Sequence, residues 1–163
     1  WAKELYGFAD HVPETEEYGV ASFVYRGRRP FVPEAIHAIL NGPMPGVIRA
    51  KGHFWIATRP SVVAEFSLAG ALSSVTPLGT WWASVPKDQW PDAENVKTYI
   101  AEHWQEPWGD RRQEIVFIGA GIDWPALKAR LNAALLPESF GSTSDALADL
   151  PDPFPVWGRQ AAA

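Results

Sequence analysis

Cysteine is absent from this 163-residue sequence, and that absence removes several classes of site at once. Without thiols the chain has no disulfide framework, no zinc–thiolate centre and no cysteine nucleophile. The sequence also lacks the run of about 20 apolar residues that a membrane-spanning helix needs. Its N-terminus shows neither the basic start nor the apolar stretch of a signal peptide. We therefore expect a cytoplasmic protein whose partners do not include a membrane.

Nucleotide-binding and catalytic signatures are missing too. No G-x-x-x-x-G-K-[ST] phosphate loop occurs, so we expect this chain by itself not to hydrolyse GTP. The segment 118–124 follows a predicted strand and opens a predicted helix, but Trp124 stands where a dinucleotide loop needs a small residue. No Ser or Thr pattern supplies the nucleophile of a catalytic triad. We predict that the chain is not an enzyme and holds no cofactor of its own.

The composition is that of a soluble globular domain. Hydrophobic residues make up 47% and charged residues 20%, and 163 residues suffice to bury one core without disulfides or metal. The net charge of -5 gives no average attraction to nucleic acid, which disfavours a nucleic-acid or small-ligand binder built on Arg and Trp. We expect no nucleic-acid partner.

The chain divides into three parts. Acidic residues cluster around Pro13 without strand or helix periodicity, which predicts that residues 1–17 are an extended linker. Residues 18–137 carry the periodic patterns of a folded domain. Residues 138–163 contain the run Leu-Pro-Asp-Pro-Phe-Pro-Val-Trp and predict a Pro-rich tail, either lying on the domain or disordered.

Within the domain, alternating and helical patterns predict the order β-α-β-β-β-α-β-α. Asp92 and Asp123 are candidate N-caps of the second and third helices. This order predicts an α+β fold, a single mostly antiparallel sheet with helices packed on one face. The expected strands are 19–26, 47–58, 62–68, 72–83 and 112–119.

Basic residues gather near the ends of three predicted strands. Guanidinium groups brought together there would bind carboxylates or a phosphate of a partner surface. The alternative is that they are solvated charges paired with neighbouring acids such as Asp110 and Glu114. We predict an interaction surface made of Arg29, Arg49, Lys51, Trp55, Asp110, Arg111 and Arg112.

Metal binding would have to use imidazole and carboxylate groups. Glu34 and His37 lie on neighbouring turns of the first predicted helix, and a chance pair on a solvated helix face is the competing explanation. The candidate ligands are His11, His37, His53 and His103.

Five stretches occur in order along the sequence, at residues 14–26, 29–31, 47–58, 81–82 and 109–119. Taken together, they resemble the C-terminal domain of CobW-type P-loop GTPases, a family of metal chaperones. The resemblance covers almost the whole chain, including the Pro-Asp-Pro-Phe-Pro run. Many relatives carry His where this chain has Val32, and Cys near Ala134, so a metal role at those positions is not expected here.

The resemblance implies an α+β accessory domain that follows an N-terminal GTPase domain, with residues 1–17 as the linker between them. It implies a parent protein that uses GTP with magnesium and carries zinc or another divalent metal. Family members are proposed to deliver zinc or cobalt to client metalloproteins or to cobalamin synthesis. We therefore expect a non-catalytic module that docks on its GTPase domain or on a client protein; the alternative is a domain that binds zinc directly.

Overall fold

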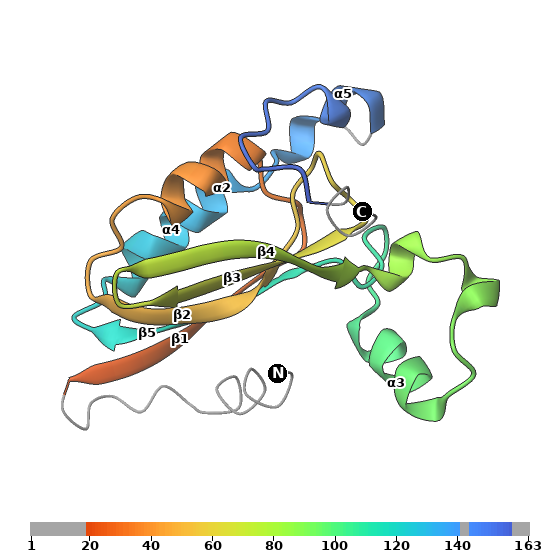
Figure 1. The fold of residues 1–163 in the computed structure, drawn as a ribbon, viewed down its shortest axis with the longest axis horizontal. Coiled ribbons are helices and arrows are strands. Elements are labelled where there is room, and N and C mark those ends of the chain that lie inside the picture. The colour runs from red at the N-terminus through yellow and green to blue at the C-terminus, as the bar shows by residue number, and fades with distance from the viewer. Residues whose placement is uncertain (1–18, 141–143, 158–163) are drawn as a thin grey trace.

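One five-stranded antiparallel sheet organises the chain. The computed structural model describes residues 19–140 and 144–157. The strand order is β1-β5-β2-β3-β4, so the last strand of the sequence inserts between the first two (Figure 1). The strands are β1 (Val20–Gly27), β2 (Val47–Phe54), β3 (Val62–Ala69), β4 (Leu72–Thr80) and β5 (Gln113–Ala120).

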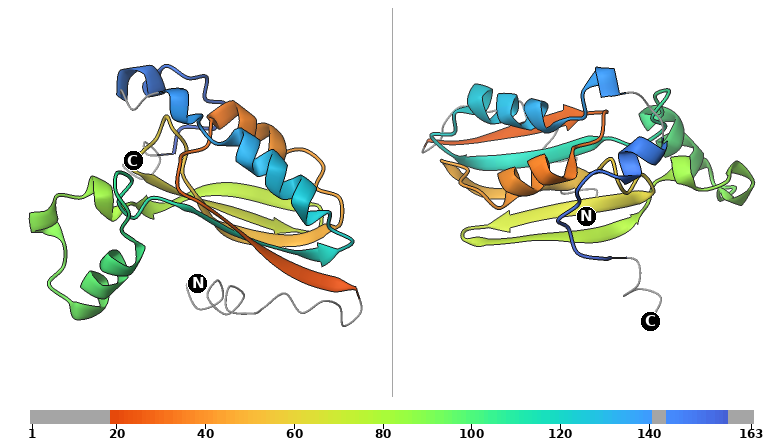
Figure 2. Two further views of the ribbon diagram at one scale, coloured as in Figure 1. Left: turned by 180° about the vertical axis from the view of Figure 1, so that it is seen from behind. Right: turned by 90° about the horizontal axis from the view of Figure 1, so that it is seen from above.

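Two helices, α2 (Pro33–Leu40) and α4 (Trp124–Ala134), lie side by side on one face of the sheet (Figure 2). Proline at the start of α2 has the fixed φ angle that a first helical turn uses. The Asp123 side chain accepts a hydrogen bond from the Ala126 amide at 3.1 Å, which confirms it as the N-cap of α4. The apolar sides of both helices face the sheet.

The core lies between these helices and the sheet. Alternate strand residues point toward the helices, because successive side chains of a strand face opposite sides. Tyr25, Phe54, Phe66 and Phe117 are fully buried on this side, and Leu131 of α4 packs among them. The period-two patterns of the sequence therefore sort the strand residues correctly into a core set and an outward set.

Residues 81–110 leave the sheet after β4 and return at β5; we call them the arm. The arm contains the short helices η1 (Trp82–Ser84) and η2 (Lys87–Gln89) and the helix α3 (Glu94–His103). It projects beyond the end of the sheet in all views (Figures 1 and 2). The prediction that Asp92 caps this helix is wrong: Ala93 occupies the N-cap, and the Asp92 carboxylate accepts a hydrogen bond from Lys97 at 2.6 Å.

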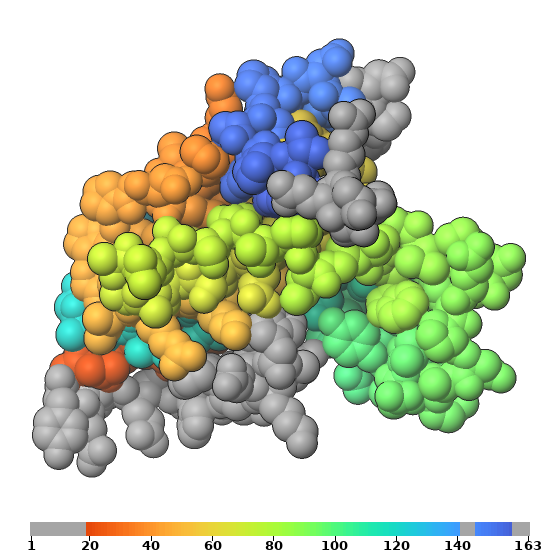
Figure 3. Space-filling view, in the orientation of Figure 1, coloured from red at the N-terminus to blue at the C-terminus, as the bar shows by residue number. Residues whose placement is uncertain are grey.

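The C-terminal part of the chain returns to the helix-covered side. After η3 (Glu138–Phe140) and the single turn α5 (Ser144–Ala148), residues 150–157 have no regular secondary structure and bend at Leu150 and Phe154; we call these residues the strap. Figure 3 shows the C-terminal residues packed against α2. Of the two alternatives for the tail, the strap therefore follows the first, because it lies on the domain.

The α+β fold class and the order of the main elements are confirmed. The predicted linker, residues 1–17, lies outside the described residues. None of the helices in the described ranges combines the length and the apolar character needed to cross a membrane.

Candidate functional site

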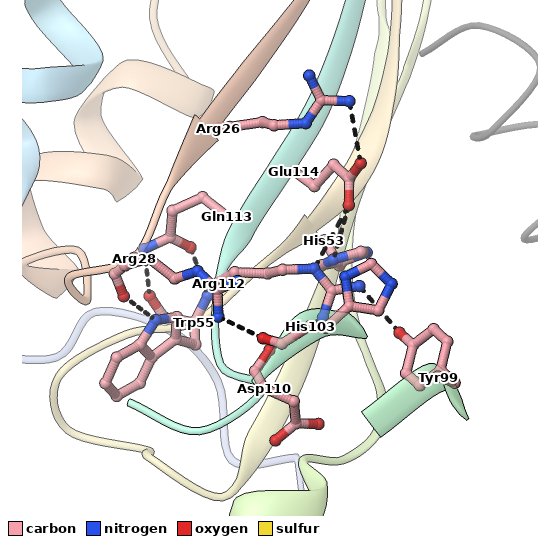
Figure 4. Close-up of polar contacts among 10 residues, drawn as sticks. All are labelled: Arg26, Arg28, His53, Trp55, Tyr99, His103, Asp110, Arg112, Gln113 and Glu114. Atoms are coloured by element: carbon pink, nitrogen blue, oxygen red, sulfur yellow. Dashed lines mark hydrogen bonds and ion pairs between the residues drawn. The ribbon is translucent and has the colours of Figure 1, made fainter. Parts of the chain in front are cut away.

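A buried polar cluster lies where β1, β5 and β2 run side by side, next to the arm (Figure 4). The register pairs Arg26 with Glu114 and Glu114 with His53, which gives one row across three strands. The Nη2 atom of Arg26 lies 3.5 Å from Oε1 of Glu114. The row faces away from α2 and α4, because the neighbours Tyr25 and Ile115 face the core.

Arg112 is the central member of the cluster. Its side chain is buried, and its Nε atom lies 3.4 Å from Oε2 of Glu114. Its Nη1 group donates to the Asp110 carbonyl oxygen and its Nη2 group donates to the Tyr99 hydroxyl, each at 2.9 Å. Since Tyr99 belongs to α3, Arg112 ties the arm to the sheet.

Asp110 and Arg28 complete this attachment. The Asp110 carboxylate accepts hydrogen bonds from the backbone amides of Trp82 and Ala83 at 2.9 and 2.8 Å, which fixes the start of the arm. Arg28 donates to the carbonyl oxygens of His103 and Gly109, which fixes its end. A buried carboxylate with these partners is satisfied within the chain.

Two histidines of the cluster are held in the neutral form. Burial, helped by the nearby charge of Arg112, lowers the pKa of His53 to about 3. Burial and Arg112 also lower the pKa of His103. The Nε2 atom of His53 lies 3.9 Å from Oε2 of Glu114, and its ring packs edge-on against Trp81. Neutral imidazole is the form that binds metal, but it is also the form expected of a packed core histidine.

The described histidines do not assemble into a metal centre. His37 lies on α2 and packs edge-on against Phe154, away from His53 and His103. No group of three or more His, Asp or Glu side chains in residues 19–140 and 144–157 is placed to hold a metal ion. The fourth candidate, His11, lies outside the described residues.

A small cavity of about 180 Å³ adjoins the cluster. Its walls come from the end of β4, from Trp81 and Trp82, and from His53, Tyr99 and Asp110. The polar atoms of Asp110 already bind backbone amides. The arrangement therefore suits anchoring of the arm better than acid–base chemistry.

The seven residues predicted as one interaction surface do not form one surface, although Arg111 lies over the Trp55 ring and Arg112 donates to the Asp110 carbonyl oxygen. Trp55, Asp110 and Arg112 are 4%, 2% and 5% exposed, so their side chains face the interior rather than a partner. The indole of Trp55 donates to the Arg28 carbonyl oxygen at 2.9 Å. These three residues support the fold. The alternative of solvated charges paired with neighbouring acids is right about the pairing of Arg112 with Glu114 but wrong about its solvation, because Arg112 is buried.

Arg29 and Arg111 bind carbonyl oxygens of neighbouring loops. Arg29 donates to the Leu136 carbonyl and lies 3.4 Å from Glu138 on the side of α4. Arg111 donates to the Pro60 carbonyl at 2.6 Å and to the Ser84 hydroxyl at 2.7 Å. These two guanidinium groups hydrogen-bond to loops at one end of the sheet. They lie away from Arg49 and Lys51 on β2.

The face of the sheet opposite α2 and α4 carries Arg49 and Lys51; we call it the helix-free face, because within residues 19–140 and 144–157 the helices α2 and α4 pack on the other face. The register pairs Ile118 with Arg49, and Val116 with Lys51. Arg26 lies on the same face, with its side chain 58% exposed. Among the described residues, the arm borders this face only at the end near His53. Sequence reasoning did not include Arg26 in the surface, although the alternation of β1 already placed it opposite Tyr25.

Comparison with known proteins gives a match to one family. Residues 20–135 match the model of the family described as "Cobalamin synthesis protein cobW C-terminal domain". A zinc-regulated GTPase metalloprotein activator of Dictyostelium discoideum is 39% identical over 143 residues, and the match covers 85% of this chain and 30% of that protein. A zinc chaperone of Mycobacterium tuberculosis is 30% identical, with 85% and 35% covered.

A solved structure of zinc-bound YjiA GTPase from E. coli is similar at 17% identity, with a TM-score of 0.48 over 72% of this chain and 30% of that one. The chain thus spans about a third of the length of the curated relatives it matches.

Proposed function

Since the chain belongs to the cobW C-terminal domain family, we propose that it is the non-catalytic accessory domain of a GTPase metallochaperone. In this proposal the parent protein binds GTP with magnesium and carries zinc or another divalent metal to a client metalloprotein. The names of the relatives, a zinc-regulated GTPase activator and a zinc chaperone, support zinc as the cargo. A role in cobalamin synthesis is supported only by the description of the family. The cytoplasmic location stays a prediction.

We propose further that the helix-free face docks on the GTPase domain of the same protein. The observation that carries this proposal is the set of cations on that face, Arg26, Arg49 and Lys51, beside exposed apolar side chains. Val20 is 39% exposed at the start of β1. The cations Arg49 and Lys51 thus lie on the central strand β2, and Val20 lies at the edge of the same face.

The path of the chain also favours this face. Gly19 leads into β1, an edge strand, at the end of the sheet that lies away from the arm (Figure 1). A domain joined there through the predicted linker, residues 1–17, enters next to the edge strand of the helix-free face. The helix-covered face is already occupied by α2, α4 and the strap. Cations on the docking face would select an acidic surface on the partner.

The test is a calorimetric titration of this chain into the separately produced GTPase domain of the same parent, loaded with GDP or with a GTP analogue. Charge reversal by Arg49→Glu with Lys51→Glu is expected to weaken binding about tenfold or more, because like charges placed opposite each other across an interface oppose association. The matched control is Lys128→Glu with Arg130→Glu on the exposed side of α4, which changes the charge equally and should leave the affinity unchanged.

Different affinities for the GDP-loaded and the GTP-analogue-loaded GTPase domain would show that this domain distinguishes the two nucleotide states. Equal weakening by both double variants would point to a general charge effect and contradict docking by the helix-free face. Absence of binding in both nucleotide states would overturn docking on the GTPase domain and favour a client protein as the partner.

A further inference from the structure

The strap is held by a carboxylate anchor. Oδ2 of Asp152 accepts hydrogen bonds from the Thr58 hydroxyl at 2.6 Å and from Nε of Arg59 at 2.9 Å, and Oδ1 accepts from Nη2 of Arg59 at 3.2 Å. The Arg59 and Asp152 side chains are 19% and 17% exposed. A bidentate contact between a guanidinium group and a carboxylate that are both largely buried fixes the orientation of the two side chains as well as their position.

Arg59 also binds the backbone of the strap. Its Nη2 group donates to the Phe154 carbonyl at 2.8 Å and its Nη1 group donates to the Pro155 carbonyl at 2.6 Å. The guanidinium carbon lies 4.3 Å from the centre of the Trp157 ring, a cation–π contact. The Arg59 side chain thus contacts a carboxylate, two carbonyl groups and an aromatic ring of the strap.

Two aromatic side chains provide the apolar contacts of the strap. Phe154 and Trp157 are each 6% exposed. The Phe154 ring packs edge-on against His37 with centroids 5.1 Å apart and lies 6.3 Å from Phe54. We call the surface made by His37, Phe54, Thr58 and Arg59 the strap site.

The strap behaves as a ligand of the domain rather than as part of its sheet. It joins none of the five strands, and the hydrogen bonds from Thr58 and Arg59 to the strap are donated by their side chains rather than by their backbone. Every residue of the strap site lies within the family match at 20–135, whereas the strap lies beyond it. Pro-rich segments are common peptide ligands, because proline reduces the conformational entropy lost on binding.

We propose that the strap site is a peptide-binding site, that the strap is its resident ligand, and that a partner protein binds there by displacing the strap. The partner segment is a peptide with an acidic residue followed by aromatic residues two and five positions later, as in Asp-Pro-Phe-Pro-Val-Trp. The site lies on the helix-covered side, so this inference does not depend on docking of the GTPase domain by the helix-free face.

Because the strap is part of the same chain, it competes with any other peptide for the strap site. A ligand joined by a short connection competes at an effective concentration of about a millimolar. The strap therefore excludes weak peptides and yields only to a partner that binds more tightly or also contacts a second surface.

The test uses the full chain and a fluorescein-labelled peptide with the sequence of residues 150–157. In a loosened variant that carries Asp152→Ala, Phe154→Ala and Trp157→Ala, the strap lacks its anchors. Fluorescence anisotropy is expected to show binding to the loosened variant at least tenfold tighter than to the wild type. Adding Arg59→Ala to the loosened variant should weaken it again at least tenfold, whereas adding Arg49→Ala, the matched control, should not.

The proposal is overturned if a folded loosened variant binds the peptide no better than the wild type, or if Arg59→Ala and Arg49→Ala have equal effects. If the loosened variant does not fold, the proposal is tested instead by a peptide titration of the wild type. Unlabelled peptide at several millimolar should move the Trp157 indole resonance in a nitrogen-15 spectrum to its position in a free peptide. An unmoved resonance would overturn the proposal.

Discussion

Arginine side chains in this domain divide into buried tethers and exposed surface charges. Arg112 lies inside, bound to Glu114, Tyr99 and the Asp110 carbonyl. Arg49 on β2 is exposed on the helix-free face. The two residues look alike in the sequence, and only their burial assigns one to the fold and the other to the proposed interface.

Replacement of Arg112 by alanine should destabilise the fold strongly. The change leaves the Glu114 carboxylate, 11% exposed, without its buried cation, and it releases Tyr99 of the arm. Removal of one member of a buried ion pair costs about 3 to 5 kcal/mol. We expect a loss of about 3 kcal/mol in the free energy of unfolding, measured by urea denaturation at pH 7.

The control is Arg49→Ala, for which a change within about 0.5 kcal/mol is expected, as at most exposed positions. A loss for Arg112→Ala as small as that of the control would mean that Arg112 is not a structural tether.

At the scale of elements, β2 and β5 approach more closely than side chains allow. A Cβ atom at Gly52 would lie 2.1 Å from the Glu114 carbonyl oxygen on β5 and 2.4 Å from the Ile115 Cα atom. Gly52 therefore lets two central strands meet beside the polar cluster. This close approach of the two strands brings Glu114 on β5 next to His53 on β2.

The variant Gly52→Ala should force β2 and β5 apart. Overpacking of a dense interior costs about 1 to 3 kcal/mol, and here the neighbouring atoms belong to the backbone, which yields least. We expect a loss of about 3 kcal/mol in thermal or urea unfolding.

Gly79→Ala on the edge strand β4 is the matched substitution, since no atom lies within 4 Å of the added Cβ. It should change stability little. Similar losses for both glycines would contradict this explanation, because only Gly52 of the two has backbone atoms in close approach.

At the scale of the whole molecule, the strap links the end of the chain to the loop between β2 and β3. Burial disfavours the charge of Asp152, but hydrogen bonds from Thr58, Arg59 and the Phe154 amide, with the charge of Arg59, outweigh it and lower the pKa of this carboxyl. A carboxyl with a lowered pKa in the folded state stabilises the fold above its pKa in the unfolded chain. That stabilisation is lost as the pH falls through the folded pKa.

Asp152→Asn should therefore cost stability at neutral pH and little in acid. Hydrogen bonds to a charged partner contribute about 2 kcal/mol, so we expect a difference of about that size between wild type and variant at pH 7. The difference should shrink below about pH 4, where Asp in the unfolded chain becomes protonated.

Urea unfolding of both proteins at pH 7 and pH 3 measures this difference, with Asp149→Asn, an exposed acid before the strap, as the control. A difference that does not depend on pH would contradict the role of the Asp152 charge.

The sequence by itself determined the elements and their faces. Alternation in β1 and the four-residue spacing of Leu127 and Leu131 in α4 report local burial, which depends on periodicity alone. The Asp123 cap was equally predictable, because a cap hydrogen bond joins residues three positions apart. The ordered motifs carried the family assignment, which the match over residues 20–135 confirms.

Only the tertiary structure decided which charged residues meet. The insertion of β5 between β1 and β2 places Glu114 beside both Arg26 and His53, and no periodicity in the sequence encodes that order of strands. The strap depends in the same way on Arg59, which lies 93 positions before Asp152. Contacts across such distances follow from the packing of the whole chain, so a buried tether such as Arg112 could not be told in advance from a surface cation such as Arg49.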